Sequence, residues 1–554
     1  MSEYNQSGGR PHPGRRRFVL GTAGAMALGS GALSACGGGD QERKERFGYG
    51  IASGDPLSDR VILWTRVNLA DGPTTVQWEL AKDPGFVNMV ASGTAATSAA
   101  QDYTVKVDAT GLAPGTPYWY RFRLGADTSA TGRTRTLPVG DVGQVRLAVF
   151  SCAAYPLGQF HAYANAANRG DIDVAVHLGD YIYESGLTGL EQAAASLIDR
   201  KIDPSYETLT LPDYRARYAR YRTDADLRGL HATMPIIAVW DDHELINGIW
   251  KDGADGHDAS EGSFVARREA AAQAWREWLP VRVPDPAQPL RIYRSFDFGK
   301  LATLHMLDAR VIARDAPISA DAYLAGAAND PNRQILGQQQ QDWLAAGLAA
   351  SQATWQVLGQ QVPMGRMDVP LSVFNNFTQG RLDEYIKALE LPAASRTAAQ
   401  QALVAQPKVP MDLAHWGGFS AAREKVLAAA KAADRNLVVL AGDSHNAFAS
   451  DLRDASGAAV GVEFATTSVT STGLEFKYRD IDRQFLADAL VKIMPDLKFA
   501  ETSRRGYTLV TLTPQAARAD FIFVSSVLAN SFSASVGRSL QTLPGEGNRR
   551  LLSV

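Results

Sequence analysis

The chain has 554 residues, which is enough for two or three domains of ordinary size. Its apolar content of 45% and charged content of 21% are those of a typical globular protein. The net charge of −3 leaves no basic excess, which argues against a nucleic-acid-binding surface.

Residues 1–36 have the pattern of an export signal. Arg15 and Arg16 form a twin-arginine pair in GRRRFVL. The Gly-rich apolar run that follows is shorter than the roughly 20 residues of a transmembrane helix. It ends in LSAC, which resembles a lipobox, so Cys36 would be lipidated and residues 37–45 would form a flexible tether. The alternative is ordinary signal-peptidase cleavage near Ala35, with Cys36 incidental.

Residues 46–138 are rich in β-branched and aromatic residues. The runs VILWTRV (61–67) and VQWEL (76–80) are typical of strands. The segment LAPGTPYWYRF (112–122) has the spacing of a tyrosine corner, in which the Tyr118 hydroxyl bonds to the backbone upstream. These features predict a small β-sandwich of the immunoglobulin or fibronectin type.

From residue 145 to 525, short apolar β runs alternate with amphipathic helical stretches. The predicted strands are 145–150, 172–178, 235–240, 301–307, 355–358 and 437–441. The predicted helices are 264–279, 337–350, 381–391 and 419–433. This alternation predicts an α/β layered core.

A stretch rich in Tyr and Arg lies within this region. Tyr214, Tyr218 and Tyr221 share one helix face at spacings of three and four. We interpret this helix as an aromatic packing face with snorkelling arginines. The alternative is that one of its arginines binds a phosphate.

Four clusters of side chains that bind metals or transfer protons follow predicted strands. They are Cys152, GDYIYE (179–184) with Asp180 and Tyr183, WDDHELIN (240–247) with Asp242, His243 and Asn247, and AGDSHN (441–446) with Asp443 and His445. Ligands bind outside the carboxyl ends of strands in open α/β sheets. The four clusters therefore predict a metal site.

The donor types limit the metal. Carboxylate and amide oxygens suit Ca²⁺. A phenolate with a thiolate suits a trivalent ion such as Fe³⁺, with Asp180 as a bridge between ions. Cys152 has no disulfide partner if Cys36 is lipidated or removed, which favours a ligand role, although an unpaired buried thiol can also be plain packing. His243 is either a ligand or a proton donor. For both His243 and His445, the alternative is a buried, hydrogen-bonded imidazole with no role in the reaction.

Motifs along almost the whole chain resemble the bacterial alkaline phosphatase D family of calcineurin-like metallophosphatases. The matching segments are GIASGDPLSDRVILWTRV, FSC, HLGDYIYE, WDDHE, LDAR, LGQQQQDWL, LGQQVPM, AGDSHN and EFATTSVTS. The resemblance implies a four-layer α/β/β/α catalytic core over residues 145–525, preceded by an immunoglobulin-like domain. One departure is Trp416–Phe419, WGGF where the family has WDGY, which implies a changed pocket wall.

The resemblance also implies roles for individual residues. Cys152, Asp180 and Tyr183 would hold one Fe³⁺, with two Ca²⁺ alongside. Asp242 stands where the wider superfamily has a ligand Asn, and Gln361 where it has a ligand His. Asp443 and His445 fall on the last ligand motif, and His243 falls on the general acid. Residues 526–554 form a tail of uncertain fold, in which Ser525–Arg538 would be a helix covering the site.

The expected function is that of an exported hydrolase acting on phosphate monoesters, with diesters as a further class, through a metal-bound hydroxide. We expect a monomer that the twin-arginine translocase delivers to the periplasm or cell surface. One alternative is a phosphodiesterase or phospholipase D-like enzyme that acts on lipid headgroups or polymers. An alternative of another class is an inactive, surface-anchored binding protein, against which the intact ligand set argues.

Overall fold

The computed structural model describes residues 45–69 and 71–554. The predicted signal residues Arg15 and Arg16, the lipidation site Cys36 and almost all of the tether lie outside the described residues. Within the described ranges, no helix combines the length and the apolar character needed to cross a membrane.

The larger of two main sheets has ten strands in the order β24-β23-β22-β21-β9-β10-β11-β1-β2-β5. Its centre consists of three parallel strands, β9 (Val145–Phe150), β10 (Val174–His177) and β11 (Ile236–Ala238). One flank holds β21 (Gly506–Leu512), β22 (Ala517–Val524), β23 (Ala534–Thr542) and β24 (Leu552–Ser553). The other flank holds β1 (Ile51–Gly54), β2 (Arg60–Arg66) and β5 (Thr104–Thr110).

The second sheet has seven strands in the order β12-β13-β14-β17-β19-β18-β20. Its strands are β12 (Arg294–Phe298), β13 (Ala302–Met306), β14 (Trp355–Gly359), β17 (Asn436–Ala441), β18 (Ala447–Arg453), β19 (Ala459–Ala465) and β20 (Leu497–Glu501). Strands β13, β14, β17 and β19 run parallel. All six β runs predicted in the catalytic region are strands.

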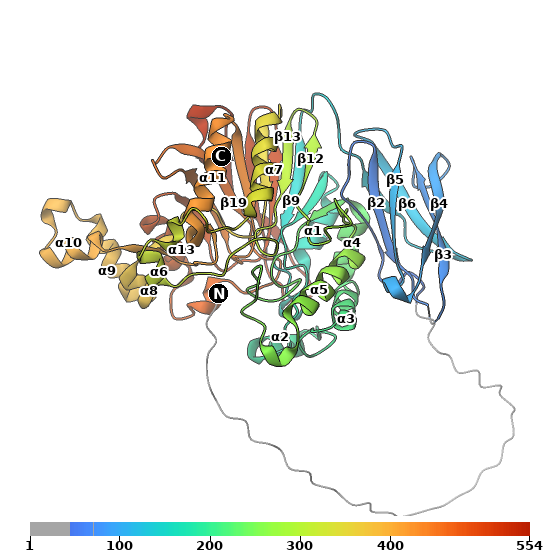
Figure 1. Cartoon of the computed structure of the whole chain (residues 1–554), viewed down its shortest axis with the longest axis horizontal. Helices are drawn as coiled ribbons and strands as arrows, with labels where there is room; N and C mark the ends of the chain where they lie inside the picture. Colours follow the sequence, from blue (N-terminus) through green and yellow to red (C-terminus); the bar gives the residue numbers. More distant parts are fainter. Residues whose placement is uncertain (1–44, 70) are drawn as a thin grey trace, which may run out of the picture.

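Successive residues of the second sheet point into two different cores. Val438 and Leu440 belong to the core that also holds the central strands of the large sheet. Leu437 and Val439 instead pack with apolar residues of α7 (Gly337–Ala350) and α11 (Ser420–Ala432). This period of two places one sheet between the other sheet and a helix layer. Figure 1 shows α7 and α11 along the second sheet.

Helices also pack against the large sheet. Phe150 of β9 meets Tyr163 of α1 (His161–Arg169), with ring centroids 5.0 Å apart. Further helices of this region are α2 (Gly189–Leu197), α3 (Leu211–Tyr221), α4 (Ala225–Thr233) and α5 (Phe264–Trp278). An α/β catalytic region with an N-terminal β domain is therefore confirmed.

The N-terminal domain is a sandwich, and its tyrosine corner is present. A small sheet of β3 (Thr74–Ala81), β4 (Met89–Thr97), β6 (Pro117–Leu124), β7 (Asp127–Thr128) and β8 (Gly132–Arg135) shares a core with β1, β2 and β5. The Ala113 N–H donates to the Tyr118 hydroxyl over 2.8 Å.

One face of this sandwich continues into the catalytic sheet. Gly54 of β1 pairs in parallel with Ile236 of β11. The buried Asp55, just after β1, forms a two-point ion pair with the buried Arg294 of β12, at 2.7 and 2.8 Å. The segment 46–138 therefore folds as a sandwich but shares a sheet with the region that follows it.

The Tyr/Arg stretch forms α3, and its arginines bind protein groups. Tyr214, Tyr218 and Tyr221 are fully buried, as the packing interpretation requires. The Arg217 guanidinium, also fully buried, donates to four backbone carbonyls, including those of Tyr183 and Ser185. The phosphate-binding alternative therefore has no support for Arg217.

The prediction of a lid helix at 525–538 is wrong. Residues 534–542 form β23, which pairs antiparallel with β22 along its length. Long-range pairing with β22 overrides the local helix preference of this segment. The pairing also covers an edge of β22 that would otherwise be open. The loop 525–533 nevertheless lies beside α1, since His161 Nδ1 is 2.8 Å from the Ser526 carbonyl and its ring stacks on Phe532.

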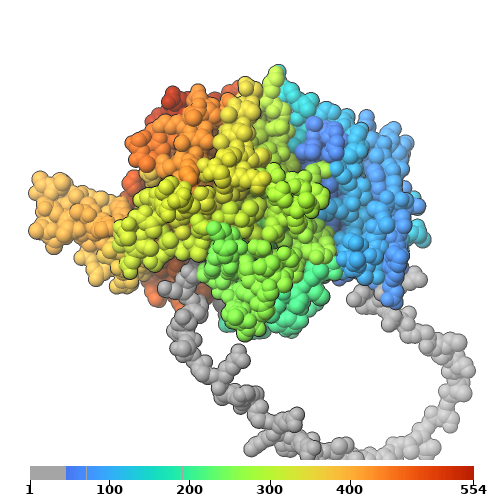
Figure 2. Space-filling model, viewed as in Figure 1, coloured from blue at the N-terminus to red at the C-terminus, as the bar shows by residue number. Residues whose placement is uncertain are grey.

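Further helices lie around the second sheet. They are α6 (Ala320–Leu324), α8 (Leu371–Asn375), α9 (Gln379–Glu390), α10 (Ala398–Ala405), α12 (Leu474–Lys477) and α13 (Arg483–Ile493). A two-stranded sheet of β15 (Asp368–Pro370) and β16 (Lys408–Pro410) joins them. Figure 2 shows the part around α9 and α10 protruding at the end opposite the N-terminal domain.

Candidate metal centre

The candidate site lies where parallel strands of both sheets end. Cys152, Asp180 and Asp242 follow β9, β10 and β11 of the large sheet. Asp308–Arg310, Gln361 and Asp443 follow β13, β14 and β17 of the second sheet. The four strand-end clusters meet here. Seven of their side chains form three overlapping groups, and the potential ligand atoms within each group lie within 4.8 Å of one another.

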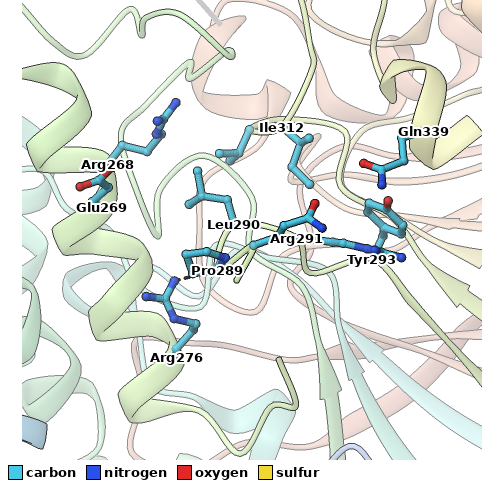
Figure 3. Close-up of a pocket in the computed structure, with 11 residues that line it drawn as sticks. Arg268, Glu269, Arg276, Pro289, Leu290, Arg291, Tyr293, Ile312 and Gln339 are labelled. Carbon is cyan, nitrogen blue, oxygen red and sulfur yellow. Dashed lines mark hydrogen bonds between the residues drawn. The ribbon is translucent and has the colours of Figure 1, made fainter. Parts of the chain in front are cut away.

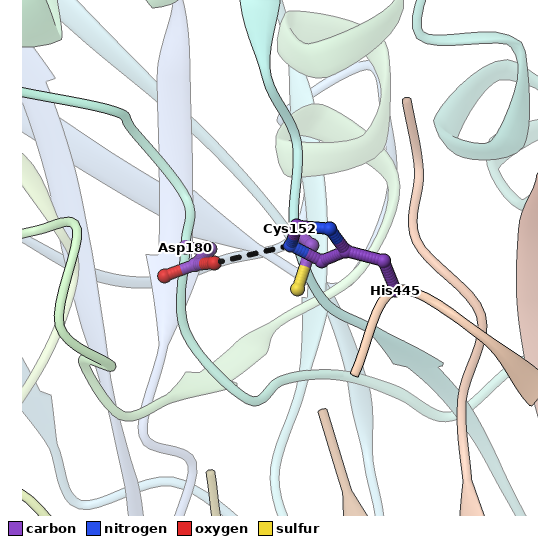
Figure 4. Close-up of side chains that lie close together, drawn as sticks. All are labelled: Cys152, Asp180 and His445. Atoms are coloured by element: carbon purple, nitrogen blue, oxygen red, sulfur yellow. Dashed lines mark ion pairs between the residues drawn. The ribbon is translucent and has the colours of Figure 1, made fainter. Parts of the chain in front are cut away.

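The first group consists of Cys152, Asp180 and His445, each from a different loop. Figure 4 shows the three side chains pointing toward one another. The His445 Nδ1–H donates to the Thr472 carbonyl over 2.7 Å, so the opposite ring nitrogen, Nε2, takes no part in this bond. That Nε2 is 3.8 Å from Asp180 Oδ2 and therefore faces the group.

Tyr183 completes this half of the site. Its hydroxyl is 2.9 Å from Asp180 Oδ2, 3.2 Å from His445 Nε2 and 2.6 Å from the Ser471 hydroxyl. The phenol oxygen thus occupies the same small volume as the three donors of the first group. Ser471, from the TSVTS segment, was not predicted as a site residue.

The other two groups are built from carboxylates. One contains Asp180, Asp242 and His243, and the other contains Asp241, Asp242 and Asp443. Arg310 lies among the second set, where its guanidinium donates to Asp241 and Asp443. Asp443 also accepts from His415 Nε2 over 2.6 Å.

His243 is held by a carboxylate on the neighbouring loop. Its Nδ1 is 2.8 Å from Glu184 Oε2, and its ring stacks on Tyr183 at 4.2 Å between centroids. Burial lowers the pKa of His243, but the carboxylates of Glu184 and Asp180 outweigh this effect and raise it well above its ordinary value. These carboxylates therefore favour the imidazolium form of His243, in which Nε2 carries the second proton.

Glu244 clamps two of the metal-site loops together. Its carboxylate accepts the backbone N–H groups of Asp180, Tyr181 and Asp241 at 2.7 to 2.9 Å. At Gly179, with φ of 105°, a Cβ atom would lie 2.3 Å from the Asp241 Cβ, so only glycine fits between the loops. Burial raises the pKa of Glu244 to about 8, although three N–H donors oppose the shift.

Four site residues adopt left-handed backbone conformations. Cys152, Asp180, Asp443 and His445 have φ between 54° and 60°. Such conformations cost on the order of 1–3 kcal/mol each in non-glycine residues, and they cluster at functional sites. The fold therefore holds these side chains in one place at the expense of backbone strain.

The donor set fits a group of cations. Burial raises the pKa of the Cys152 thiol and of the Tyr183 phenol, and the Asp180 carboxylate raises both further. Burial likewise raises the pKa of Asp241, although Arg310 opposes it. Asp241 Oδ2 and Asp242 Oδ1 are buried without a hydrogen-bond partner. Adjacent positive charge would lower these pKa values and satisfy both oxygens.

Two predicted ligands have other contacts. Gln361 donates to the Trp240 and Leu307 carbonyls, at 2.7 and 3.0 Å, and accepts from the Ala309 N–H. Its amide thus ties three strand-end loops together. Asn247 donates its backbone N–H to Glu184 Oε1 over 2.7 Å, and no hydrogen bond joins its side chain to the site among the described residues.

Several functional residues were missed in the sequence. Glu184 and Arg310 both lie within motifs that follow predicted strands, so the strand-end signal that located Asp180 applied to them as well. His415 lies next to the WGGF departure and had no such signal. Its contact with Asp443 depends on the tertiary fold.

Comparisons with known proteins agree with this geometry. Residues 147–521 match the family model described as PhoD-like phosphatase, and residues 32–138 match its N-terminal domain. Alkaline phosphatase D of Bacillus subtilis (strain 168) is 34% identical over 534 residues, covering 92% of this chain and 84% of that protein. A solved structure of PhoD superposes with a TM-score of 0.75 at 31% identity, covering 93% of each chain. The chain therefore belongs to the PhoD-like phosphatase family and is a phosphoester hydrolase.

Proposed function

We propose that the chain is an exported, metal-dependent phosphatase that hydrolyses phosphate monoesters and accepts diesters as a further class. The single observation that carries the proposal is the convergence of Cys152, Asp180, Asp242, Asp443 and His445 at the strand ends of two sheets. The similarity to alkaline phosphatase D supports the same reaction.

The proposed metals are one Fe³⁺ and two Ca²⁺. Cys152, Asp180, Tyr183 and His445 would hold the iron, because thiolate and phenolate donors suit a trivalent ion. The carboxylates around Asp242 and Asp443 would hold calcium, which prefers oxygen ligands. When bound, these ions neutralise phosphoryl charge and activate water.

Residues of the chain supply the remaining chemistry. The His243 imidazolium, oriented through Nδ1 by Glu184, would donate its other proton to the leaving alkoxide. The buried Arg310 guanidinium donates to Asp241 and Asp443 and so positions carboxylates of the proposed calcium site. Arg217 supports the site by binding the carbonyls of Tyr183 and Ser185.

Turnover of nitrophenyl phosphate and of bis(nitrophenyl) phosphate by the purified protein tests this proposal. We expect hydrolysis of the monoester. A His243→Ala variant should be at least about 100-fold slower on an alkyl phosphate, whose leaving alkoxide needs a proton, and should lose less on nitrophenyl phosphate. A protein that hydrolyses only the diester would instead be a phosphodiesterase, which is the second candidate. A protein that hydrolyses neither would overturn the proposal.

Export by the twin-arginine route is proposed from GRRRFVL and the LSAC segment. Periplasmic or cell-surface delivery of the folded enzyme, with Cys36 as a lipid anchor, follows from these motifs. When Arg15 and Arg16 are replaced with Lys, the active enzyme should stay in the cytoplasm. Unchanged export of that variant would contradict the route, and a Cys36→Ala variant that stays membrane-bound would contradict the anchor.

A further inference from the structure

A second concave site lies apart from the ligand groups of the metal centre. We call it the arginine cavity. Its volume is about 440 Å³, and it is lined by residues of α5, of segment 288–293, of the turn after β13 and of α7. Figure 3 shows Arg268 and Arg276 on α5 at one side and Arg291 and Tyr293 at the other. Its volume falls in the range of sites that bind small organic molecules.

The cavity has an excess of positive charge. Arg268, Arg276 and Arg291 line it together with one carboxylate, Glu269. Within residues 45–69 and 71–554, none of these three guanidinium groups forms an ion pair. Arg268 and Arg276 each donate to one backbone carbonyl, at 3.1 and 3.0 Å. Most of their donor capacity is therefore unused.

Two other arginines of this region form ion pairs. Arg294, three residues after Arg291, forms a two-point pair with Asp55, and Arg215 pairs with Glu277 over 2.7 Å. By contrast, Arg291 forms no ion pair among the described residues and lies over the Tyr293 ring at 4.7 Å. The Nε atoms of Arg268 and Arg291 are buried without a partner, as are those of several arginines elsewhere in the fold.

A buried hydroxyl in the lining is also unpartnered. Tyr293 is 2% exposed, its ring packs on Trp343 at 4.9 Å, and its hydroxyl has no hydrogen-bond partner. Native buried polar atoms are nearly always hydrogen-bonded, so an unpartnered hydroxyl that lines a cavity is a donor open to a ligand or to water. Burial raises the pKa of Tyr293, although Arg291 opposes the shift, so the phenol remains a neutral donor.

We propose that the arginine cavity binds an organic phosphate through these guanidinium groups and the Tyr293 hydroxyl. The donors select an anion, and the apolar lining from Leu290, Val311 and Ile312 accommodates an organic group beside it. The choice of phosphate over carboxylate rests on the phosphatase activity. Val311 and Ile312 directly follow Arg310, so a single turn contributes to both sites.

Calorimetric titration of the holoenzyme with phenylphosphonate, which cannot be hydrolysed, tests the proposal. We expect two binding sites per chain in the wild type, and one after the combined changes R268Q, R276Q and R291Q. The matched control removes three exposed cations elsewhere, K300Q, R381Q and K387Q, and should keep both sites. A single site in the wild type, or two in the cavity variant, would overturn the proposal.

Two further titrations check the ligand class. Benzoate that fills the second site as tightly as phenylphosphonate would overturn the phosphate assignment. Inorganic phosphate that fills it as tightly would overturn the role of the organic group. Turnover of nitrophenyl phosphate in the same samples separates failure of the metal centre from failure of the cavity.

A Tyr293→Phe variant keeps the test independent of folding. It removes a hydroxyl that has no partner in the protein, so the melting temperature should not fall. The affinity of the second site for phenylphosphonate should weaken by about threefold to tenfold, as expected for one lost hydrogen bond. Unchanged affinity would contradict the proposal that the Tyr293 hydroxyl binds the ligand.

Discussion

At the residue scale, the site depends on side chains that orient the predicted ligands. Glu184 accepts from His243 Nδ1 and from the Asn247 N–H, so one carboxylate fixes both the imidazole and the loop that carries it. Partners of this kind typically change activity by about 10–100-fold when they are removed.

Replacing Glu184 with Gln should lower kcat by about 10–100-fold. The loss should be larger for an alkyl phosphate than for nitrophenyl phosphate, because an alkoxide needs a proton to leave and a nitrophenolate does not. Steady-state kinetics with both substrates measures this difference. Glu384→Gln, which removes an exposed carboxylate of α9 that pairs with Arg381, is the control and should leave kcat unchanged. Equal losses for the two substrates would argue against an acid role for His243.

Two buried histidines should make the free energy of unfolding fall at acidic pH. Burial lowers the pKa of His177 from 6.5 to about 3 and that of His231 well below its ordinary value. The unfolded chain therefore takes up protons below about pH 6.5 that the folded chain does not, so stability is lost as the pH falls from there.

Each such histidine contributes a slope of about 1.4 kcal/mol per pH unit in the free energy of unfolding. Denaturant melts between pH 7 and pH 4.5 should show this slope. A His177→Asn variant should reduce this slope by about 1.4 kcal/mol per pH unit between pH 6 and pH 4.5, which corresponds to one proton. An unchanged slope in that variant would mean that His177 is not a neutral group in the folded state.

The strand-end rule predicted Cys152, Asp180, Tyr183, His243 and the AGDSH residues because each follows an apolar β run in its own segment. The same rule marks Glu184, Arg310 and Gln361 as strand-end residues, but it does not identify the groups that they bind. Their partners lie 59, 69 and 52 residues away in the chain, and only the packing of two sheets brings them together.

At the element scale, segments with strong local patterns were predicted best. The helix at 337–350 and the strand at 145–150 have the predicted bounds. The C-terminal strand β23 has mostly exposed or half-exposed residues and little local pattern. This segment forms a strand because it pairs with β22, and the local sequence does not indicate that pairing.

Removing residues 526–554 should destabilise the protein. The truncation strips β23 from β22 and leaves an open edge carrying Phe521 and Phe523, and such edges promote aggregation. Light scattering and thermal melts of the purified truncated protein would measure the effect. The control removes only residues 552–554, which contribute two pairs to β23. A soluble, fully stable 1–525 protein would show that β23 is dispensable.

At the scale of the whole molecule, the N-terminal sandwich and the catalytic region form a continuous sheet. The join includes the buried Asp55–Arg294 pair and the Trp64 indole N–H, which donates to the Glu277 carbonyl over 2.7 Å. The sequence placed the domain boundary near residue 138 from a change in pattern. It could not show that β1 pairs with β11, because the paired residues, Gly54 and Ile236, lie 182 positions apart in the chain.

An Asp55→Ala variant should lose about 3–5 kcal/mol of unfolding free energy, because Arg294 remains buried without its partner. Chemical denaturation compares it with Asp59→Ala, which breaks an exposed pair with Arg60 and should not change stability measurably. Equal stability of the two variants would show that the two domains are not coupled through this pair.

The central claim is that one thiolate, one phenolate and several carboxylates hold iron and calcium at the shared sheet edge. Metal content of the purified wild type and of Cys152→Ala, measured in parallel, tests it most directly. We expect one iron and two calcium ions per wild-type chain, with iron lost and calcium largely kept in the variant. Zinc alone in the wild type, or full iron content in Cys152→Ala, would contradict the account.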